Sequence, residues 1–446
     1  MPMSRRSLLA GVALSPVLLR AGQIPGDFRR LASTPPMGWN SWDTFATTIR
    51  EEEARSIAKI MAAQLLPHGY NIFTIDAQWY EPGADGFDYR KDAVLTIDEF
   101  GRLTPAVNRF PSSANGAGFK PLADYVHSIG LKFGIHVMRG VPRQAAQQNM
   151  PILGSTARAG DIADRLNVCE WNADMYGIDM SKPGAQEYYD SLFRLYASWG
   201  VDFVKADDMS RPYFRNEPEI HAVRSAINRC GRLMLLSLSP GETPLTAATD
   251  VRFNANMWRI SDDFWDTWPA LLEQFDRLKN WSAYARAGTW PDADMLPLGV
   301  LELGRRKTLF TAEEQQTLLT LWCIARSPLI MGGDLRKLDD STLSLLTNDE
   351  VLAVNQYSVG SRELFRNDGL AAWCAQPRHQ GAYLAAFNLR DSAATIPVKL
   401  GELGIGGAAN VRDLWHRADL PMVRGQFSPR ILAHGAGLYR LSPQKA

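Results

Sequence analysis

Short apolar runs alternate with amphipathic helical stretches from about residue 33 to residue 345, and this alternation limits the fold more than any other feature. About eight runs are strand-like: PMGWNSW (36–42), NIFTIDAQW (71–79), LKFGIHVM (131–138), VDFVKA (201–206), LMLLSLS (233–239), ANMWRI (255–260), DADML (292–296) and PLIMG (328–332). Most are followed by a helical stretch, which predicts parallel strands joined by right-handed crossovers. A count near eight favours a (β/α)8 TIM barrel over an open sheet.

The pattern changes after Tyr357, where helical periodicity fades and short alternating runs appear between turn residues. LAAWCAQ, GAYLAAFNL and GLYRLS are typical of antiparallel strands. The sequence therefore predicts a (β/α)8 barrel over residues 33–356 and an antiparallel β-sandwich domain over residues 357–446.

Charge and cysteine content narrow the range of functions. The 446 residues hold 48 basic and 48 acidic side chains, so net charge gives no argument for a nucleic-acid partner or a membrane surface. None of the four cysteines stands in a metal-binding spacing, and no metal site is expected. The oligomeric state cannot be read from the sequence.

The first 25 residues have the character of an export signal. Arg5 and Arg6 precede an apolar run from about Leu8 to Leu19, which is too short for a transmembrane helix. SRRSLLAG resembles a twin-arginine signal, which predicts a bacterial protein exported to the periplasm or beyond. The alternative is a basic N-terminus without a targeting role.

The run VDFVKADDMS (201–210) places charges at the end of a strand. Lys205 and Asp207 share one face of that strand, and Asp208 faces the other way. In a barrel these residues lie at the C-terminal end, where active sites are built, and a neighbouring ammonium keeps a carboxylate ionised. A structural ion pair is the alternative.

Acidic residues also follow other predicted strands. Asp76 ends the second predicted strand, in TIDAQW (74–79). Three aspartates follow Arg259 in WRISDDFWDTW (258–268), and Asp292 and Asp294 lie in PDADML. Glycoside hydrolysis needs two carboxylates across one bond, with polar groups that hold the sugar hydroxyls.

Several motifs, in order, resemble glycoside hydrolase family 27, the α-galactosidase and α-N-acetylgalactosaminidase family. They are TPPMGWNSWD (34–43), GVDFVKADD (200–208), GTWPDADMLPLG (288–299), SPLIMGGDL (327–335), LTNDEVLAVNQ (346–356) and VRDLWHRADL with HGAGLYRL near the C-terminus. The resemblance covers nearly all of the chain that follows the export signal.

The resemblance implies a retaining exo-glycosidase with Asp207 as nucleophile. In the family an arginine precedes the acid/base aspartate by four residues, which selects Asp263 over Asp262. The resemblance also implies sugar contacts from six further residues: Trp42, Asp76, His136, Lys205, Arg259 and Asp294. It implies no cofactor, and a carbohydrate is the expected ligand.

Three departures from the family bear on the substrate. The family has two adjacent aspartates after strand two, whereas this chain has Asp76 and Ala77. Ser239 in LSLSPGET (236–243) lies near a glutamate position of the α-galactosidases, as a serine does in the N-acetylgalactosaminidases; an ordinary turn is the alternative. The long segment 139–171 is expected to cover the cleft, with Arg139, Trp171 and His136 as candidate contacts.

The default activity is release of terminal α-D-galactosyl residues. Alternatives are an α-N-acetylgalactosaminidase, suggested by Ser239, and a relative acting on β-L-arabinopyranosides or releasing isomaltose, suggested by Ala77. A carbohydrate-binding protein without catalysis is a further alternative, against which both aspartates argue.

Overall fold

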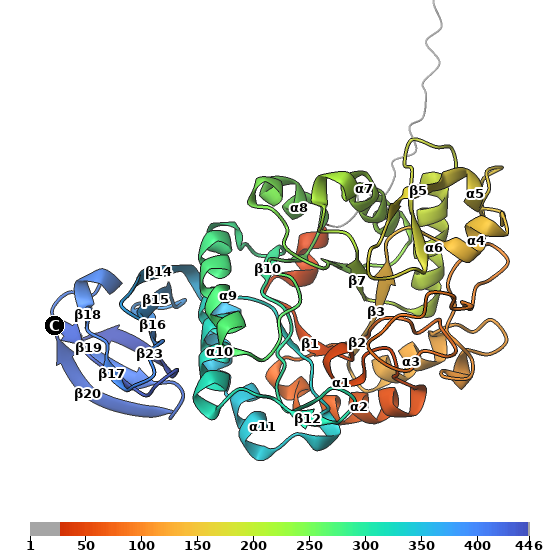
Figure 1. Ribbon diagram of the computed structural model, residues 1–446. Helices are drawn as coiled ribbons and strands as arrows, with labels where there is room; N and C mark the ends of the chain where they lie inside the picture. The colour runs from red at the N-terminus through yellow and green to blue at the C-terminus, as the bar shows by residue number, and fades with distance from the viewer. Residues whose placement is uncertain (1–26, 445–446) are drawn as a thin grey trace, which may run out of the picture.

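The computed structural model describes residues 27–444, and the export signal predicted over residues 1–25 lies outside them. Eight parallel strands form one curled sheet in the order β10-β9-β8-β7-β3-β2-β1-β13 (Figure 1). These strands are β1 (Met37–Asn40), β2 (Ile72–Ile75), β3 (Lys132–Met138), β7 (Phe203–Asp207), β8 (Leu235–Leu238), β9 (Met257–Arg259), β10 (Trp290–Asp292) and β13 (Leu329–Met331).

The two edges of this sheet meet just beyond β10. Leu296 forms a parallel bridge with Met331, in which the N–H of Leu296 donates to the carbonyl of Ile330 over 2.8 Å. The (β/α)8 barrel predicted from the sequence is therefore confirmed. The strand predicted over residues 292–296 lies earlier in the chain, as β10 over Trp290–Asp292. It ends at Asp292 because Asp294 adopts a φ of 85°, which breaks the extended backbone.

Helices surround the sheet and follow the strands in turn. They are α1 (Trp42–Phe45), α2 (Glu51–Gln64), α3 (Lys120–Ser128), α6 (Ala185–Trp199), α7 (Tyr213–Arg229), α8 (Ala248–Asn254), α9 (Trp268–Trp281), α10 (Ala312–Ala325), α11 (Asp340–Leu346) and α12 (Asp349–Tyr357). Gly200, at φ 88°, ends α6 in the left-handed conformation and leads directly into β7. None of the helices within residues 27–444 is both long and apolar enough to cross a membrane.

The segment between β3 and α6 folds into a small unit of its own. It contains α4 (Arg143–Gln147), α5 (Ala159–Ile162) and a three-stranded sheet of β4 (Val141–Pro142), β6 (Met175–Ile178) and β5 (Ala163–Val168). Trp171, between β5 and β6, reaches the mouth of the barrel. This part of the long segment is where the sequence predicts a cover for the cleft.

The C-terminal domain is an antiparallel β structure packed beside the barrel (Figure 1). Its main sheet has the order β14 (Val359–Asn367), β15 (Leu370–Gln376), β16 (Ala382–Asn388), β23 (Ala436–Pro443), β19 (Ala408–Asp413) and β20 (Ala418–Arg424). Two pairs of short strands accompany it: β17 (Ala394–Thr395) with β22 (Arg430–Ile431), and β18 (Val398–Lys399) with β21 (Gln426–Phe427). Phe387 of β16 meets Phe275 of α9 edge to face, with ring centroids 5.0 Å apart. The antiparallel domain predicted after Tyr357 is confirmed.

Apolar side chains fill the interior of the barrel below its mouth. Ile72, Phe203, Leu235, Met257, Trp290 and Ile330 belong to this buried layer. Because side chains alternate along a strand, Phe203 points into the same space as Lys205 and Asp207 of β7, which come next toward the C-terminal end. The interior packing thus orients the charged residues that stand above it.

Candidate active site

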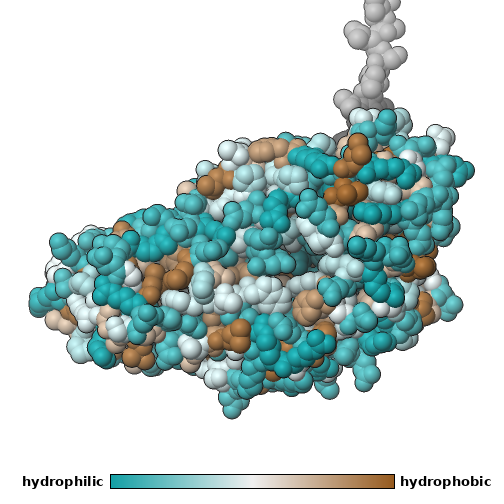
Figure 2. Space-filling model, viewed as in Figure 1, coloured by the Kyte–Doolittle hydropathy of each residue, from teal (hydrophilic) through white to brown (hydrophobic). Residues whose placement is uncertain are grey.

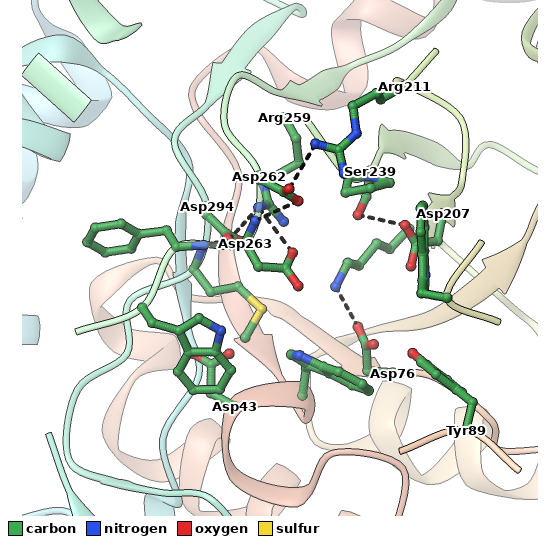
Figure 3. A pocket seen from close by; sticks show the side chains of 17 residues that line it. Asp43, Asp76, Tyr89, Asp207, Arg211, Ser239, Arg259, Asp262, Asp263 and Asp294 are labelled. Carbon is green, nitrogen blue, oxygen red and sulfur yellow. Dashed lines mark hydrogen bonds and ion pairs between the residues drawn. The ribbon is translucent and has the colours of Figure 1, made fainter. Parts of the chain in front are cut away.

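A pocket of about 300 Å³ opens at the C-terminal end of the barrel strands. Figure 2 shows a hollow over the barrel among mostly hydrophilic side chains, and Figure 3 shows the residues in it. Eight of the nine predicted site residues line it: Trp42, Asp76, Lys205, Asp207, Ser239, Arg259, Asp263 and Asp294.

Asp207 ends β7 and is held by three donors. His136 Nε2 lies 3.0 Å from Oδ2, the Ser239 hydroxyl donates to Oδ1 over 3.2 Å, and the N–H of Asp208 donates to Oδ1 over 2.9 Å. Burial alone would raise the pKa of Asp207, but His136, Lys205 and the Asp208 N–H outweigh burial and lower the pKa to about 2. The carboxylate is therefore ionised at neutral pH.

His136 is the one predicted site residue that does not line the pocket. Its side chain is completely buried, with no exposed surface, and reaches Asp207 from β3. The predicted sugar contact is therefore replaced by a contact with the carboxylate of Asp207. The register of β3 beside β7, which pairs His136 with Lys205, brings the ring to that place.

Asp76 and Lys205 form a buried ion pair on the neighbouring wall. Lys205 Nζ lies 2.9 Å from Asp76 Oδ2, and the side-chain amide of Asn40 donates to the same oxygen over 2.7 Å. Burial favours a higher pKa for Asp76, but Lys205, His136 and the Asn40 amide together outweigh burial, so the pKa is lowered. Burial also opposes the charge on Lys205, yet Asp76, Asp207 and Asp294 raise its pKa.

Arg259 connects two acidic residues on the other side of the pocket (Figure 3). Its Nη2 lies 2.6 Å from Asp294 Oδ2 and 3.3 Å from Asp263 Oδ1. The Asp263 side chain is 56% exposed, whereas that of Asp294 is buried. Asp262, which the spacing disfavours, pairs instead with Arg211 at 2.8 Å on the rim. Asp263 therefore stands at the mouth of the pocket, with more than half of its side chain open to solvent.

Asp208 and Arg139 lie away from the pocket. Arg139 Nη2 donates to Asp208 Oδ2 over 2.6 Å, and its Nη1 lies 2.6 Å from Glu219 Oε1, which belongs to α7. Arg139 is 2% exposed and does not line the pocket, so its candidacy as a substrate contact is corrected. It ties the end of β7 to α7 instead.

Several pocket residues were not identified in the sequence. Tyr89, in a long connection without regular structure, lies over the Trp42 ring at a centroid distance of 6.2 Å, with 14° between the planes. Asp43 follows Trp42 directly and lines the same pocket. The remaining additions are Arg211, Pro240, Asp262, Phe264, Trp265 and Met295. Tyr89 and Arg211 lie outside the motifs that carry the family resemblance or follow the predicted strands. The others stand inside those motifs, in TPPMGWNSWD (Asp43), LSLSPGET (Pro240), WRISDDFWDTW (Asp262, Phe264, Trp265) and GTWPDADMLPLG (Met295).

Comparison with known proteins decides the family. A family model described as "Alpha galactosidase A" matches residues 34–181 and 173–357, and one for the "Alpha galactosidase C-terminal beta sandwich domain" matches residues 367–441. The chain belongs to glycoside hydrolase family 27. It is therefore a glycosidase of the α-galactosidase type, and the alternative of a carbohydrate-binding protein without catalysis is set aside.

Relatives within family 27 differ in their sugars. An α-galactosidase of Coffea arabica is 31% identical over 421 residues, covering 93% of this chain and 95% of that protein. The crystal structure of a family 27 β-L-arabinopyranosidase from Geobacillus stearothermophilus, in complex with arabinose, is 49% identical with a TM-score of 0.92, covering 94% and 99% of the two chains. A Bacillus halodurans structure, provisionally named an α-N-acetylgalactosaminidase, is 46% identical with a TM-score of 0.83, covering 92% and 97%.

Proposed function

We propose that this family 27 enzyme is a retaining exo-glycosidase that prefers terminal β-L-arabinopyranosyl groups to α-D-galactosyl groups. The two sugars share their ring configuration, and the arabinopyranoside lacks only the C6 hydroxymethyl group. The observation that carries the preference is the single carboxylate after β2, where Asp76 is followed by Ala77.

The retained polar groups suit the hydroxyls that both sugars share. Asp76, Lys205, Arg259 and Asp294 all line the pocket and are oriented by the ion pairs between them. Ala77 is 1% exposed, and its N–H donates to Asp76 Oδ1 over 2.9 Å. Position 77 therefore offers no polar group to a C6 hydroxyl. A site that lacks a hydrogen-bonding partner for this hydroxyl gains little binding free energy from a sugar that has it.

The ionised Asp207 and the exposed Asp263 support a double displacement. Asp207 attacks the anomeric carbon while the bond to the leaving oxygen breaks, and Asp263 gives its proton to that oxygen. Asp263 then takes a proton from water, whose oxygen attacks the anomeric carbon and frees Asp207. No step in this sequence needs a cofactor.

A panel of aryl glycosides tests the preference. We expect kcat/KM for the β-L-arabinopyranoside to exceed that for the α-D-galactoside by at least about 10-fold, a typical effect for one substituent in a fitted pocket. An Ala77→Asp variant restores the second carboxylate and should narrow the ratio in favour of the galactoside. Ala77→Val adds bulk without a polar group and should lower both rates, and Asp207→Asn should abolish them. A higher rate on the galactoside in the unaltered protein would contradict the proposal.

An α-galactosidase is the second candidate, favoured by the curated relatives at 29–31% identity. An α-N-acetylgalactosaminidase is supported by the small side chain of Ser239 in the pocket wall and by the 46% identical structure. Including the α-N-acetylgalactosaminide and an α-glucoside in the panel separates these activities, and the α-glucoside also covers the isomaltose-releasing alternative.

We also propose that the enzyme is exported after folding, on the strength of Arg5 and Arg6 before the apolar run. An Arg5→Lys, Arg6→Lys double variant should remain in the cytoplasm of a bacterial host with an active twin-arginine pathway. Equal export of both proteins would contradict the proposal.

A further inference from the structure

Asp43 is a pocket residue that the proposed double displacement does not use. It lies in the first turn of α1, directly after Trp42, and its side chain is 4% exposed. Oδ2 is fully enclosed and has no hydrogen-bond partner among residues 27–444. The oxygen lies against Gly332, where an added methyl carbon would stand 1.9 Å from it. With Oδ2 enclosed in this way, Oδ1 is the oxygen that can face the pocket.

The other buried carboxylates of the pocket all have donors, whereas Asp43 has acids around it. Asp76 forms an ion pair with Lys205, and Asp294 forms one with Arg259. The charged groups around Asp43 are Asp294 after β10, Lys205 on β7, Asp263 after β9 and Asp76 after β2. An ionised carboxylate with one oxygen enclosed and unpaired would be costly in this setting.

We propose that Asp43 carries a proton in the resting enzyme and that its pocket-facing O–H donates a hydrogen bond to a hydroxyl group of the bound sugar. This assignment rests on the proposed sugar pocket. Burial, Asp294, Asp263 and Asp76 together raise the pKa of Asp43 well above its usual value, against a smaller lowering by Lys205, which is consistent with a neutral acid.

A donor is useful here because the neighbouring groups are mostly acceptors. An ionised carboxylate can only accept hydrogen bonds, whereas each sugar hydroxyl also has lone pairs that need donors. Lys205 already donates to Asp76, and the Ser239 hydroxyl donates to Asp207. A neutral Asp43 adds a donor without adding a further cation to Lys205, Arg211 and Arg259.

Two variants separate the proton from the hydrogen bond. Asp43→Asn keeps the shape and a donor, Asp43→Ala keeps neither, and both remove the titrating group. The first measurement is the melting temperature of each protein from pH 4 to pH 8. Above about pH 4 a free aspartate is ionised, so a folded state that holds the proton loses stability as pH rises. The melting temperature of each variant relative to the unaltered protein should therefore increase with pH.

The second measurement is the dissociation constant for L-arabinose and for D-galactose by calorimetry. We expect Asp43→Asn to bind within about threefold of the unaltered protein and Asp43→Ala to bind about 10-fold more weakly, as for one lost hydrogen bond. Melting differences that stay flat or fall with pH would overturn the assigned proton. Equal binding by the Ala variant, or strong loss in the Asn variant, would overturn the assigned donor.

The design also separates this inference from the sugar preference. If galactose binds more tightly than arabinose but Asp43→Ala weakens both, the proposed preference fails and the donor stands. If neither sugar binds the unaltered protein, the proposed substrate and the donor both fail, and the melting measurement still decides whether Asp43 holds a proton.

Discussion

Nε2 of His136 lies 3.0 Å from Oδ2 of Asp207, and the imidazole is completely enclosed. Nδ1 of the same ring has no partner among residues 27–444. Because an ionised carboxylate can only accept hydrogen bonds, the proton of this contact is on Nε2. In that form His136 donates to Asp207 and acts as a positioning residue.

Removing the His136 donor should move the acid limb of the pH–rate profile. In the unaltered protein the pKa of Asp207 is lowered to about 2, so the carboxylate stays ionised in mild acid. His136→Leu removes the donor and raises that pKa, so kcat/KM should begin to fall at a higher pH. At neutral pH we expect a loss of about 10- to 100-fold, as for a hydrogen bond to a charged group.

His136→Gln is the matched control, because its amide N–H can still donate. It should recover most of the activity and restore the acid limb toward that of the unaltered protein. If the Leu variant has lower activity but an unchanged acid limb, His136 serves packing alone.

Substitution of Asp263 should depend on the leaving group. Asp263→Ala removes the proposed proton donor, so a poor leaving group such as an alkyl alcohol should react on the order of 10²–10⁴-fold more slowly. A dinitrophenyl leaving group needs no proton, and its departure should be nearly unaffected. Added azide should raise turnover and give a glycosyl azide of the same anomeric configuration as the substrate. The measurement is kcat/KM for each substrate, which reports the departure of the leaving group. An equal loss of kcat/KM for the two substrates would show that Asp263 is not the proton donor.

Lys205→Met should destabilise the fold as well as the site. It leaves Asp76 as a buried, unpaired carboxylate, and breaking a buried pair costs about 3–5 kcal/mol. The pKa of Asp76 is lowered in the fold, so the pair stabilises at neutral pH and its contribution is lost as pH falls through the folded-state pKa. The difference in unfolding free energy, measured in urea, should therefore shrink toward pH 3.

The double variant Lys205→Met, Asp76→Asn controls for that charge. It should be more stable at neutral pH than Lys205→Met alone, although both lack activity. Additive losses from the two substitutions would mean that the ion pair contributes little to stability.

Arg139→Leu should lower activity without touching the pocket. It leaves the carboxylates of Asp208 and Glu219 buried without their shared partner, at a cost of about 3–5 kcal/mol in unfolding free energy. Because the Asp208 N–H orients Asp207, kcat should fall more than KM rises. Arg143→Leu is the comparison. It removes a hydrogen bond to the Met175 carbonyl and a contact of the guanidinium with the Tyr176 ring, with no buried charge left behind, and should cost about 1–2 kcal/mol.

The strands and their order could be predicted because apolar runs and helical spacing recur along the chain. The inward face of β7 also followed from alternation, which placed Lys205 and Asp207 together. The role of His136 could not be read, because it depends on the register between β3 and β7. Tyr89 belongs to an irregular connection whose path is set by packing on Trp42, and no local pattern in the sequence encodes that path.

The seam of the barrel runs beside the pocket. Leu296 and Met331 join the two edges of the sheet, Asp294 stands on one side of this joint, and Gly332 supports Asp43 on the other. The pocket is therefore complete only after the last barrel strand has docked, so a chain that stops short of β13 would carry both aspartates, Asp207 and Asp263, without an intact binding site. A bound sugar would contact residues on both sides of the joint and so stabilise the closed barrel. This stabilisation would increase with the fraction of the protein that carries a sugar.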